Sequence, residues 1–170
     1  AIKLERESYM GGITDCFRVG NISEKTYKLD INSMYPSLML EKDVPVKLVY
    51  YGKNEENLKE IYDSFKRSHL IIAKCRVRIP EEFAYILTKQ SVGHEEKAIL
   101  AYGEYEVTKP SPELEFIEEH GEILSISELA VYEGANVFRD FVEFFYTRRM
   151  EFKAQGDKVN EQFTKIILNS

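Results

Sequence analysis

The segment Leu70–Ile79, LIIAKCRVRI, places the strictest limit on the fold of this chain. Apolar residues occupy every second position, and the positions between them carry Ile72, Lys74, Arg76 and Arg78. Successive side chains of a β-strand point to opposite faces, so the pattern predicts a strand with one buried face and one charged face. Pro80 cannot donate a ladder hydrogen bond and ends the strand. We therefore expect a sheet with helices packed on one face.

Shorter segments on both sides of this strand extend the same architecture. Strands are expected at residues 13–19, 26–33, 46–51 and 122–132, with two further short strands around Gly103 within residues 97–107. Helices are expected at residues 37–40, 55–66 and 113–120. This mixture predicts an α+β fold built on a mostly antiparallel sheet.

The pattern changes to helical spacing after residue 136. One apolar stripe comprises Phe138, Phe141, Val142 and Phe145. Gly156 and Asp157 then predict a helix break followed by an N-cap. A second helix is expected at residues 157–170, with its apolar stripe at Val159, Phe163, Ile166 and Ile167. The chain is therefore expected to end in a helical hairpin.

The composition excludes several classes of protein. The chain has 170 residues, is 44% hydrophobic and contains no run of apolar residues long enough to span a membrane, so no membrane partner is expected. Its net charge of −6 argues against a free-standing nucleic-acid-binding domain, although net charge does not exclude a local basic surface. Cys16 and Cys75 are expected to be free thiols in a reducing compartment. The sequence begins without an initiator Met or a signal peptide, and its last predicted helix has no C-cap glycine. We therefore expect a part of a longer chain.

Asp30 is the first residue that suggests chemistry, because it precedes a turn rich in potential ligands. A carboxylate and a neighbouring backbone carbonyl are oxygen ligands that Mg²⁺ accepts. The following residues, Ser33-Met34-Tyr35-Pro36, can direct backbone N–H groups at an anion, and proline ends that donor set at Tyr35. Phosphoryl transfer needs a metal ligand and hydrogen-bond donors for the phosphate close together, and this stretch combines both with a tyrosine. The alternative, an aspartate on a solvated strand face, stays open at this level.

Two further groups of residues fit an anionic or nucleic-acid ligand. Arg149 and Lys153 are i,i+4 neighbours on the first predicted helix of the hairpin, and Lys165 and Asn169 are i,i+4 neighbours on the second. An ordinary solvated helix face is the alternative for these cations. The sequence Tyr9-Met10-Gly11-Gly12 permits the close approach of another backbone, such as a nucleic-acid strand, with a plain loop as the alternative.

These motifs together resemble family B DNA polymerases. Residues 30–37, DINSMYPS, resemble the DxxSLYPS stretch known as motif A. Residues 9–12, YMGG, resemble the YxGG element of the protein-primed, phage φ29-like branch, and residues 165–170, KIILNS, resemble the start of motif B, KxxxNSxYG. Arg149 and Lys153 fit the basic positions on the helix before motif B. The elements follow one another in the family order.

The resemblance implies a DNA-directed DNA polymerase that transfers nucleotides from dNTPs with two Mg²⁺ ions. Asp30 would be catalytic and would bind the metal ions, assisted by the carbonyl of Ile31. The residues expected to bind the incoming dNTP are Ser33, Met34, Tyr35, Arg149, Lys153, Lys165 and Asn169. Tyr35 would also exclude a ribose 2′-OH. Tyr9, Gly11 and Gly12 would contact the template DNA.

The resemblance also implies a division of the chain and a set of partners. Residues 1–40 would belong to a polymerase palm, residues 41–135 to further palm elements and an inserted α/β segment, and residues 136–170 to the first fingers helices. Primer–template DNA and dNTPs would be the partners, and the insertion is of the kind that contacts a terminal priming protein. A cytoplasmic protein encoded by a phage or plasmid is expected, with a mitochondrial plasmid as the alternative.

One part of the family pattern is missing from the sequence. No YxDTDS stretch, motif C, follows motif A, so the second metal-binding aspartate is absent from these 170 residues. We therefore expect the chain alone to be inactive and to bind Mg²⁺ and dNTP poorly. Two alternatives stay open, a module that docks a protein or DNA and a polymerase-like scaffold without catalysis.

Overall fold

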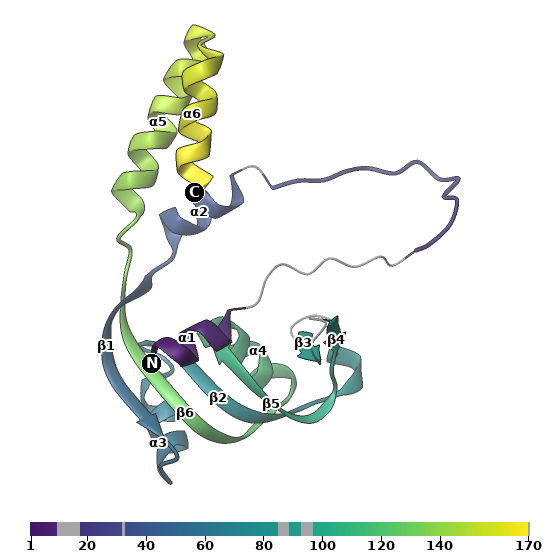
Figure 1. Cartoon of the computed structure of the whole chain (residues 1–170), viewed down its shortest axis with the longest axis vertical. Coiled ribbons are helices and arrows are strands. Elements are labelled where there is room, and N and C mark those ends of the chain that lie inside the picture. Colours follow the sequence, from purple (N-terminus) through teal and green to yellow (C-terminus); the bar gives the residue numbers. More distant parts are fainter. Residues whose placement is uncertain (10–17, 32, 85–88, 93–96, 170) are drawn as a thin grey trace. The chain divides into compact units, whose positions relative to one another are not determined.

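The computed structural model describes residues 1–9, 18–31, 33–84, 89–92 and 97–169 (Figure 1). The chain forms two compact units. The first contains Ala1–Gly11 and Pro45–Gly134, and the second contains Gly12–Val44 and Ala135–Ser170. The second unit thus combines most of the predicted segment 1–40 with the predicted segment 136–170. The assignment of these segments to palm, insertion and fingers stays a prediction.

A four-stranded sheet forms the centre of the first unit. Its strands lie in the order β1 (Val44–Lys53), β6 (Glu122–Ala135), β2 (Leu70–Ile79) and β5 (Gly103–Pro110). Strand β2 is antiparallel to both of its neighbours, and Cys75 lies opposite Val107 of β5 and Ile126 of β6. The α+β fold with a mostly antiparallel sheet is therefore confirmed. A separate antiparallel pair, β3 (Lys89–Val92) and β4 (Lys97–Leu100), and a short 3-10 helix, η1 (Glu81–Phe83), lie between β2 and β5 in the sequence.

The alternation in β2 produces the main core. Its buried residues are Ile71, Ala73, Cys75, Val77 and Ile79. Helix α3 (Leu58–Phe65) covers this face with Leu58 and Tyr62, and helix α4 (Ser111–His120) covers it with Leu114 and Ile117. Burial raises the pKa of the Cys75 thiol to about 12, so this thiol stays protonated and unreactive at neutral pH. Cys75 is a free cysteine as predicted, and Cys16 lies outside the described residues.

The opposite face of the sheet is covered too, so the prediction of helices on one face was wrong. Figure 1 shows helix α1 (Ile2–Ser8) beside the sheet. Leu4 of this helix forms a second cluster with Ile72, Ala130 and Tyr132. The Tyr132 hydroxyl donates a hydrogen bond to the Glu5 carboxylate. Helix α1 was not predicted because its seven residues contain only two apolar side chains, too few to show a helical period.

The remaining outward positions of β2 are satisfied by ion pairs. Arg78 pairs with Glu104 at 2.7 Å and with Glu122 at 2.8 Å, and Arg76 pairs with Glu104 at 3.2 Å. The hydrogen bonds from Arg78 lower the pKa of the Glu104 carboxyl. These pairs join β2 to both neighbouring strands and explain how a charged strand face is accommodated.

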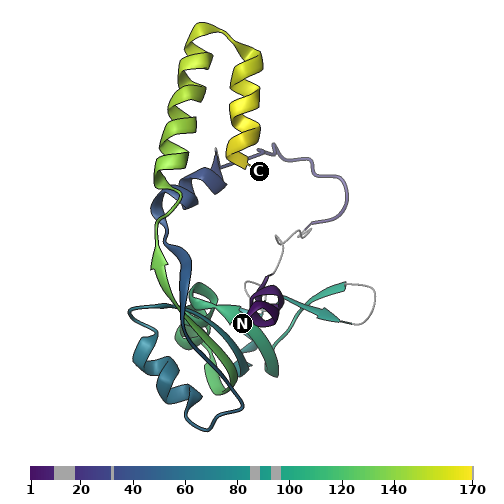
Figure 2. The same cartoon turned by 60° about the vertical axis from the view of Figure 1, so that its left-hand side comes forward.

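The described part of the second unit contains the helices α2 (Met34–Glu41), α5 (Arg139–Gln155) and α6 (Lys158–Asn169). Figure 2 shows α5 and α6 side by side as the predicted hairpin. Helix α5 ends at Gly156, which has the left-handed φ of 72° expected of a C-cap glycine. Asp157 then caps α6, since its Oδ1 accepts a hydrogen bond from the backbone N–H of Asn160. None of the helices in the described ranges combines the length and apolar composition that a membrane span requires.

Two local predictions for the second unit were wrong. Residues 18–31 contain no regular secondary structure, and the rest of the predicted strand at 13–19 lies outside the described residues. A strand needs a hydrogen-bonded neighbour, and the described part of the chain offers none to residues 26–31. In α6 the buried residues are Thr164 and Leu168, whereas Val159 is 79% exposed and Phe163 60% exposed. Thr164 can be buried because its hydroxyl donates to the carbonyl of Asn160.

The second cluster gives a test of helix α1. Leu4→Ala is expected to lower the free energy of unfolding of the first unit by about 2 kcal/mol, because it opens a cavity under a side chain that is 1% exposed. Ile2→Ala, on the same helix at a position that is 67% exposed, is the matched control and should change it by less than about 0.5 kcal/mol. Urea unfolding followed by circular dichroism measures both. Equal effects of the two substitutions would contradict the packing of α1 on the sheet.

Candidate functional site

The turn before helix α2 is fixed by Pro36. A helix that began one residue earlier would need a hydrogen bond from residue 36 to the carbonyl of residue 32, and proline has no N–H to donate. Helix α2 accordingly begins at Met34, and its first hydrogen bond runs from the Ser37 N–H to the Ser33 carbonyl at 2.9 Å. Ser33, the N-cap residue, has left-handed angles, φ 53° and ψ 43°. Such a conformation is uncommon outside glycine and costs roughly 1 kcal/mol or more.

The start of α2 leaves a small set of backbone donors. The first N–H groups of a helix have no partner within it. In α2 these include the N–H groups of Ser33, Met34 and Tyr35, whereas Pro36 has none, and no side chain caps them. The left-handed residue followed by helical residues is the arrangement that forms an anion-binding nest.

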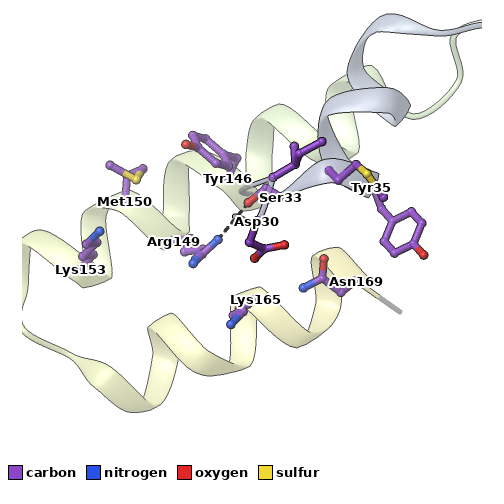
Figure 3. A pocket seen from close by; sticks show the side chains of 11 residues that line it. Asp30, Ser33, Tyr35, Tyr146, Arg149, Met150, Lys153, Lys165 and Asn169 are labelled. Carbon is purple, nitrogen blue, oxygen red and sulfur yellow. Dashed lines mark hydrogen bonds between the residues drawn. The ribbon is translucent and has the colours of Figure 1, made fainter. Parts of the chain in front are cut away.

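A cleft of about 520 Å³ lies between this turn and the two helices of the hairpin (Figure 3). All residues predicted to bind metal or dNTP line it, namely Asp30, Ile31, Ser33, Met34, Tyr35, Arg149, Lys153, Lys165 and Asn169. Tyr146 and Met150 complete the lining. Residues that are separated by more than a hundred positions in the sequence therefore meet at one site.

The cleft carries more positive than negative charge. Arg149 and Lys153 come from α5 and Lys165 comes from α6, while Asp30 is the one carboxylate in the lining. Among the described residues, no carboxylate lies within ion-pair distance of any of these three cations. Arg149 instead donates a hydrogen bond from Nη1 to the Ser33 hydroxyl at 3.3 Å (Figure 3). Such a set of cations with uncommitted charge attracts an anion with several negative charges.

The neighbouring Arg148 provides an internal comparison. Its guanidinium lies 5.6 Å from the centre of the Phe144 ring and pairs with Glu151 at 3.0 Å. Helical geometry separates the two arginines, because adjacent residues on a helix point about 100° apart. Arg149 therefore belongs to the cleft, and Arg148 belongs to another face of α5.

The metal-binding capacity of the cleft is small. Asp30 and Ile31 are both exposed, so a cation in the cleft can reach them. The Asp30 carboxylate and the Ile31 carbonyl would be its protein ligands. Within the described ranges, no three residues of the kinds that ligate metals come together. Mg²⁺ requires six oxygen ligands and commonly keeps several waters. The residues present thus fit one side of a magnesium site.

Tyr146 and Met150 are site residues that the sequence reasoning missed. They lie on α5 with Arg149 and Lys153 at the spacing i, i+3, i+4 and i+7, which defines one face of a helix. That spacing was visible in the sequence once Arg149 and Lys153 had been chosen. It would have identified both residues.

The remaining predicted residues are placed differently. The Tyr35 ring is 64% exposed and points away from Arg149 and Lys153 (Figure 3). Tyr9 belongs to the first unit and is exposed, and Gly11 and Gly12 lie outside the described residues. The predicted contact of these three residues with template DNA stays a prediction.

Comparisons with known proteins identify similar sequences and folds. The family model described as DNA polymerase type B, organellar and viral, matches residues 5–170. The DNA polymerases of Bacillus phage Nf and Bacillus phage M2 are each 26% identical to this chain, over 97% of the chain and 29% of their own length. The structure of Phi29 DNA polymerase complexed with primer-template DNA shares its fold with a TM-score of 0.56 and 19% identity, over 82% of this chain and 24% of that one. The chain thus spans less than a third of the length of these relatives.

Proposed function

The chain belongs to the organellar and viral DNA polymerases of type B, and on that premise we propose that its cleft binds the triphosphate of an incoming dNTP during DNA-templated synthesis. The observation that carries this proposal is the convergence of three cations from two helices on a turn with free backbone donors. Solved structures of Phi29 DNA polymerase with primer-template DNA, and with incoming nucleotide substrates, support DNA and dNTP as partners.

The parts of the cleft suit the parts of a triphosphate. The N–H groups of Ser33, Met34 and Tyr35 would bind phosphate oxygens at the start of α2, where the helix dipole also favours negative charge. The guanidinium of Arg149 would bind two oxygens at once, and Lys153 and Lys165 would act as point charges. Asn169, one turn after Lys165, would lie near the nascent base pair.

Asp30 would hold magnesium in the complete site. With the Ile31 carbonyl it would ligate the ions that neutralise the phosphates and activate the primer end. Two-metal sites hold their ions about 3.5–4 Å apart between ligands from separate elements. One carboxylate cannot hold such a pair, so the 170-residue chain would supply one side of the catalytic centre and would not catalyse alone.

The other predicted roles follow from the same family membership. Tyr35 would discriminate against ribonucleotides through its ring, and Tyr9, Gly11 and Gly12 would contact the template. Residues 1–40 would form part of the palm, and residues 136–170 would begin the fingers. Residues 41–135 would complete the palm and carry the segment that meets a terminal priming protein.

A docking module is the second candidate function. The first unit has its own sheet and core, with helices on both faces, and the cleft is lined by described residues of the second unit. It would therefore retain a priming protein in a pull-down even in the Asp30→Ala variant. An unmodified chain that retains no priming protein would count against the docking module.

The cations of the cleft give the first test of triphosphate binding. Arg149→Ala, Lys153→Ala and Lys165→Ala should each weaken the binding of Mg·dATP to the 170-residue chain roughly three- to tenfold, because each removes a charge-assisted contact. The measurement is a ¹H–¹⁵N NMR titration at low ionic strength, which detects weak binding. Arg148→Ala and Lys158→Ala are matched controls on the same two helices and should leave the affinity unchanged. Equal losses in the controls would mean that binding is a general effect of charge.

Catalysis gives the second test. The 170-residue chain with Mg²⁺, all four dNTPs and a primed template should extend no primer, because it holds one of the carboxylates that two metal ions need. Extension is measured on a denaturing gel with a labelled primer. Extension that disappears in the Asp30→Ala variant would refute the proposal that this chain is catalytically incomplete.

A further inference from the structure

Ser33 has an unusual position for a helix N-cap. An N-cap serine normally has β-region angles, and its hydroxyl accepts a hydrogen bond from the N–H of the second or third helical residue. Ser33 has left-handed angles and makes no such bond. The third helical residue is Pro36, which has no N–H to offer. The hydroxyl of Ser33 is thus free of the local bond that serine usually makes at this position.

The second serine of the turn behaves in the opposite way. Ser37 lies on the other side of Pro36, and its hydroxyl donates to the carbonyl of Met34 at 2.8 Å within the same helix. The Ser33 hydroxyl instead accepts the hydrogen bond from Arg149, which is 116 positions away in the sequence. Of these two serines, the one that lines the cleft is therefore the one that contacts the cationic wall.

Arg149 is the cation whose orientation matters most. A guanidinium binds phosphate as a planar fork, whereas a lysine ammonium acts as a compact charge. Arg149 is half-buried and has no carboxylate partner among the described residues, so the contact with Ser33 is the polar contact that orients it. That bond uses Nη1, and the other guanidinium donors can bind oxygens of a ligand. An oriented side chain loses less conformational entropy when a ligand binds.

The turn that holds Ser33 is itself supported by packing. Pro36 is buried, and together with Leu40, Val142 and Tyr146 it lines a second, apolar cleft. Ser33 and Tyr146 border both clefts. A buried proline therefore fixes the backbone from which the Ser33 hydroxyl reaches Arg149.

We propose that Pro36 keeps the Ser33 hydroxyl off helix α2, so that this hydroxyl positions the Arg149 guanidinium for a triphosphate. The inference rests on the proposed dNTP site and deepens it. Pro36 and the Ser33 side chain are positioning residues, in addition to any contact made by the backbone N–H groups of the turn.

Substitutions at Ser33 separate positioning from stability. Ser33→Gly removes the hydroxyl and also removes the cost of the left-handed conformation, so it should maintain or raise the melting temperature while it weakens Mg·dATP binding roughly fivefold. Ser33→Asn keeps an oxygen acceptor on a residue that tolerates left-handed angles, and it should recover most of the affinity. Ser37→Ala is the matched control and should bind like the unmodified chain. Affinity that follows the melting temperature across this series would overturn the proposal.

A double-substitution cycle tests the link to Arg149. In the Arg149→Ala background, Ser33→Gly should cause no further loss, because the group that it positions is gone. A loss that persists in this background would overturn the proposal, since it would come from the backbone of the turn.

Pro36→Ala restores an N–H at the third helical position, and it should weaken binding roughly threefold by allowing Ser33 to cap α2. An unchanged affinity of Pro36→Ala for Mg·dATP would also overturn the proposal.

The same titrations distinguish the dNTP site from the positioning role of Ser33. If Arg149→Ala, Lys153→Ala and Lys165→Ala all bind Mg·dATP like the unmodified chain, the proposed dNTP site is wrong. If these substitutions weaken binding and Ser33→Gly does not, the dNTP site stands and the positioning role of Ser33 is wrong.

Discussion

Proline at the third position of α2 cannot donate the hydrogen bond that would carry the helix one residue further toward the N-terminus. The rest of the cleft depends on this missing donor. Because this donor is missing, the helix begins at Met34, directly after the left-handed residue Ser33. The proline also removes residue 36 from the backbone donors at the start of the helix, and the Ser33 hydroxyl accepts a hydrogen bond from Arg149 instead of one from α2. The tertiary amide of Pro36 would thus influence both the backbone and the side-chain contacts on one wall of the site.

On α5, the position of a residue around the helix decides whether it lines the cleft. The residues Tyr146, Arg149, Met150 and Lys153 occupy one face of α5 and line the cleft. Arg148 belongs to a different face, where an aromatic ring and a carboxylate already occupy its guanidinium. Of two arginines that are adjacent in the sequence, one therefore lines the cleft and the other lies on a different face of α5. Composition alone cannot distinguish them, whereas a period of 3.6 residues can.

The sequence predicted best where the pattern is local. The alternation of β2 identified its buried face residue by residue, and Gly156 with Asp157 located the end of one helix and the cap of the next. It failed where the outcome depends on distant partners. Residues 26–31 have the pattern of a strand but no described neighbour to pair with, and the packed side of α6 is set by Thr164 and Leu168, not by its most apolar residues. Helix α1 is held by contacts with the sheet that its short sequence does not reveal.

The charge of the cleft separates binding from catalysis. Three cations and one carboxylate form a site that favours an anionic ligand, whereas two-metal chemistry needs further carboxylates to balance the ions. An arginine and two lysines can bind a triphosphate whether or not the metal site is complete, because their attraction acts directly on the phosphate charge. The affinity for a triphosphate is therefore the property that tests the role of these three cations. Removing Asp30 should even ease the approach of a bare triphosphate, because it removes the one negative charge that faces these cations, while it would weaken any binding that depends on magnesium.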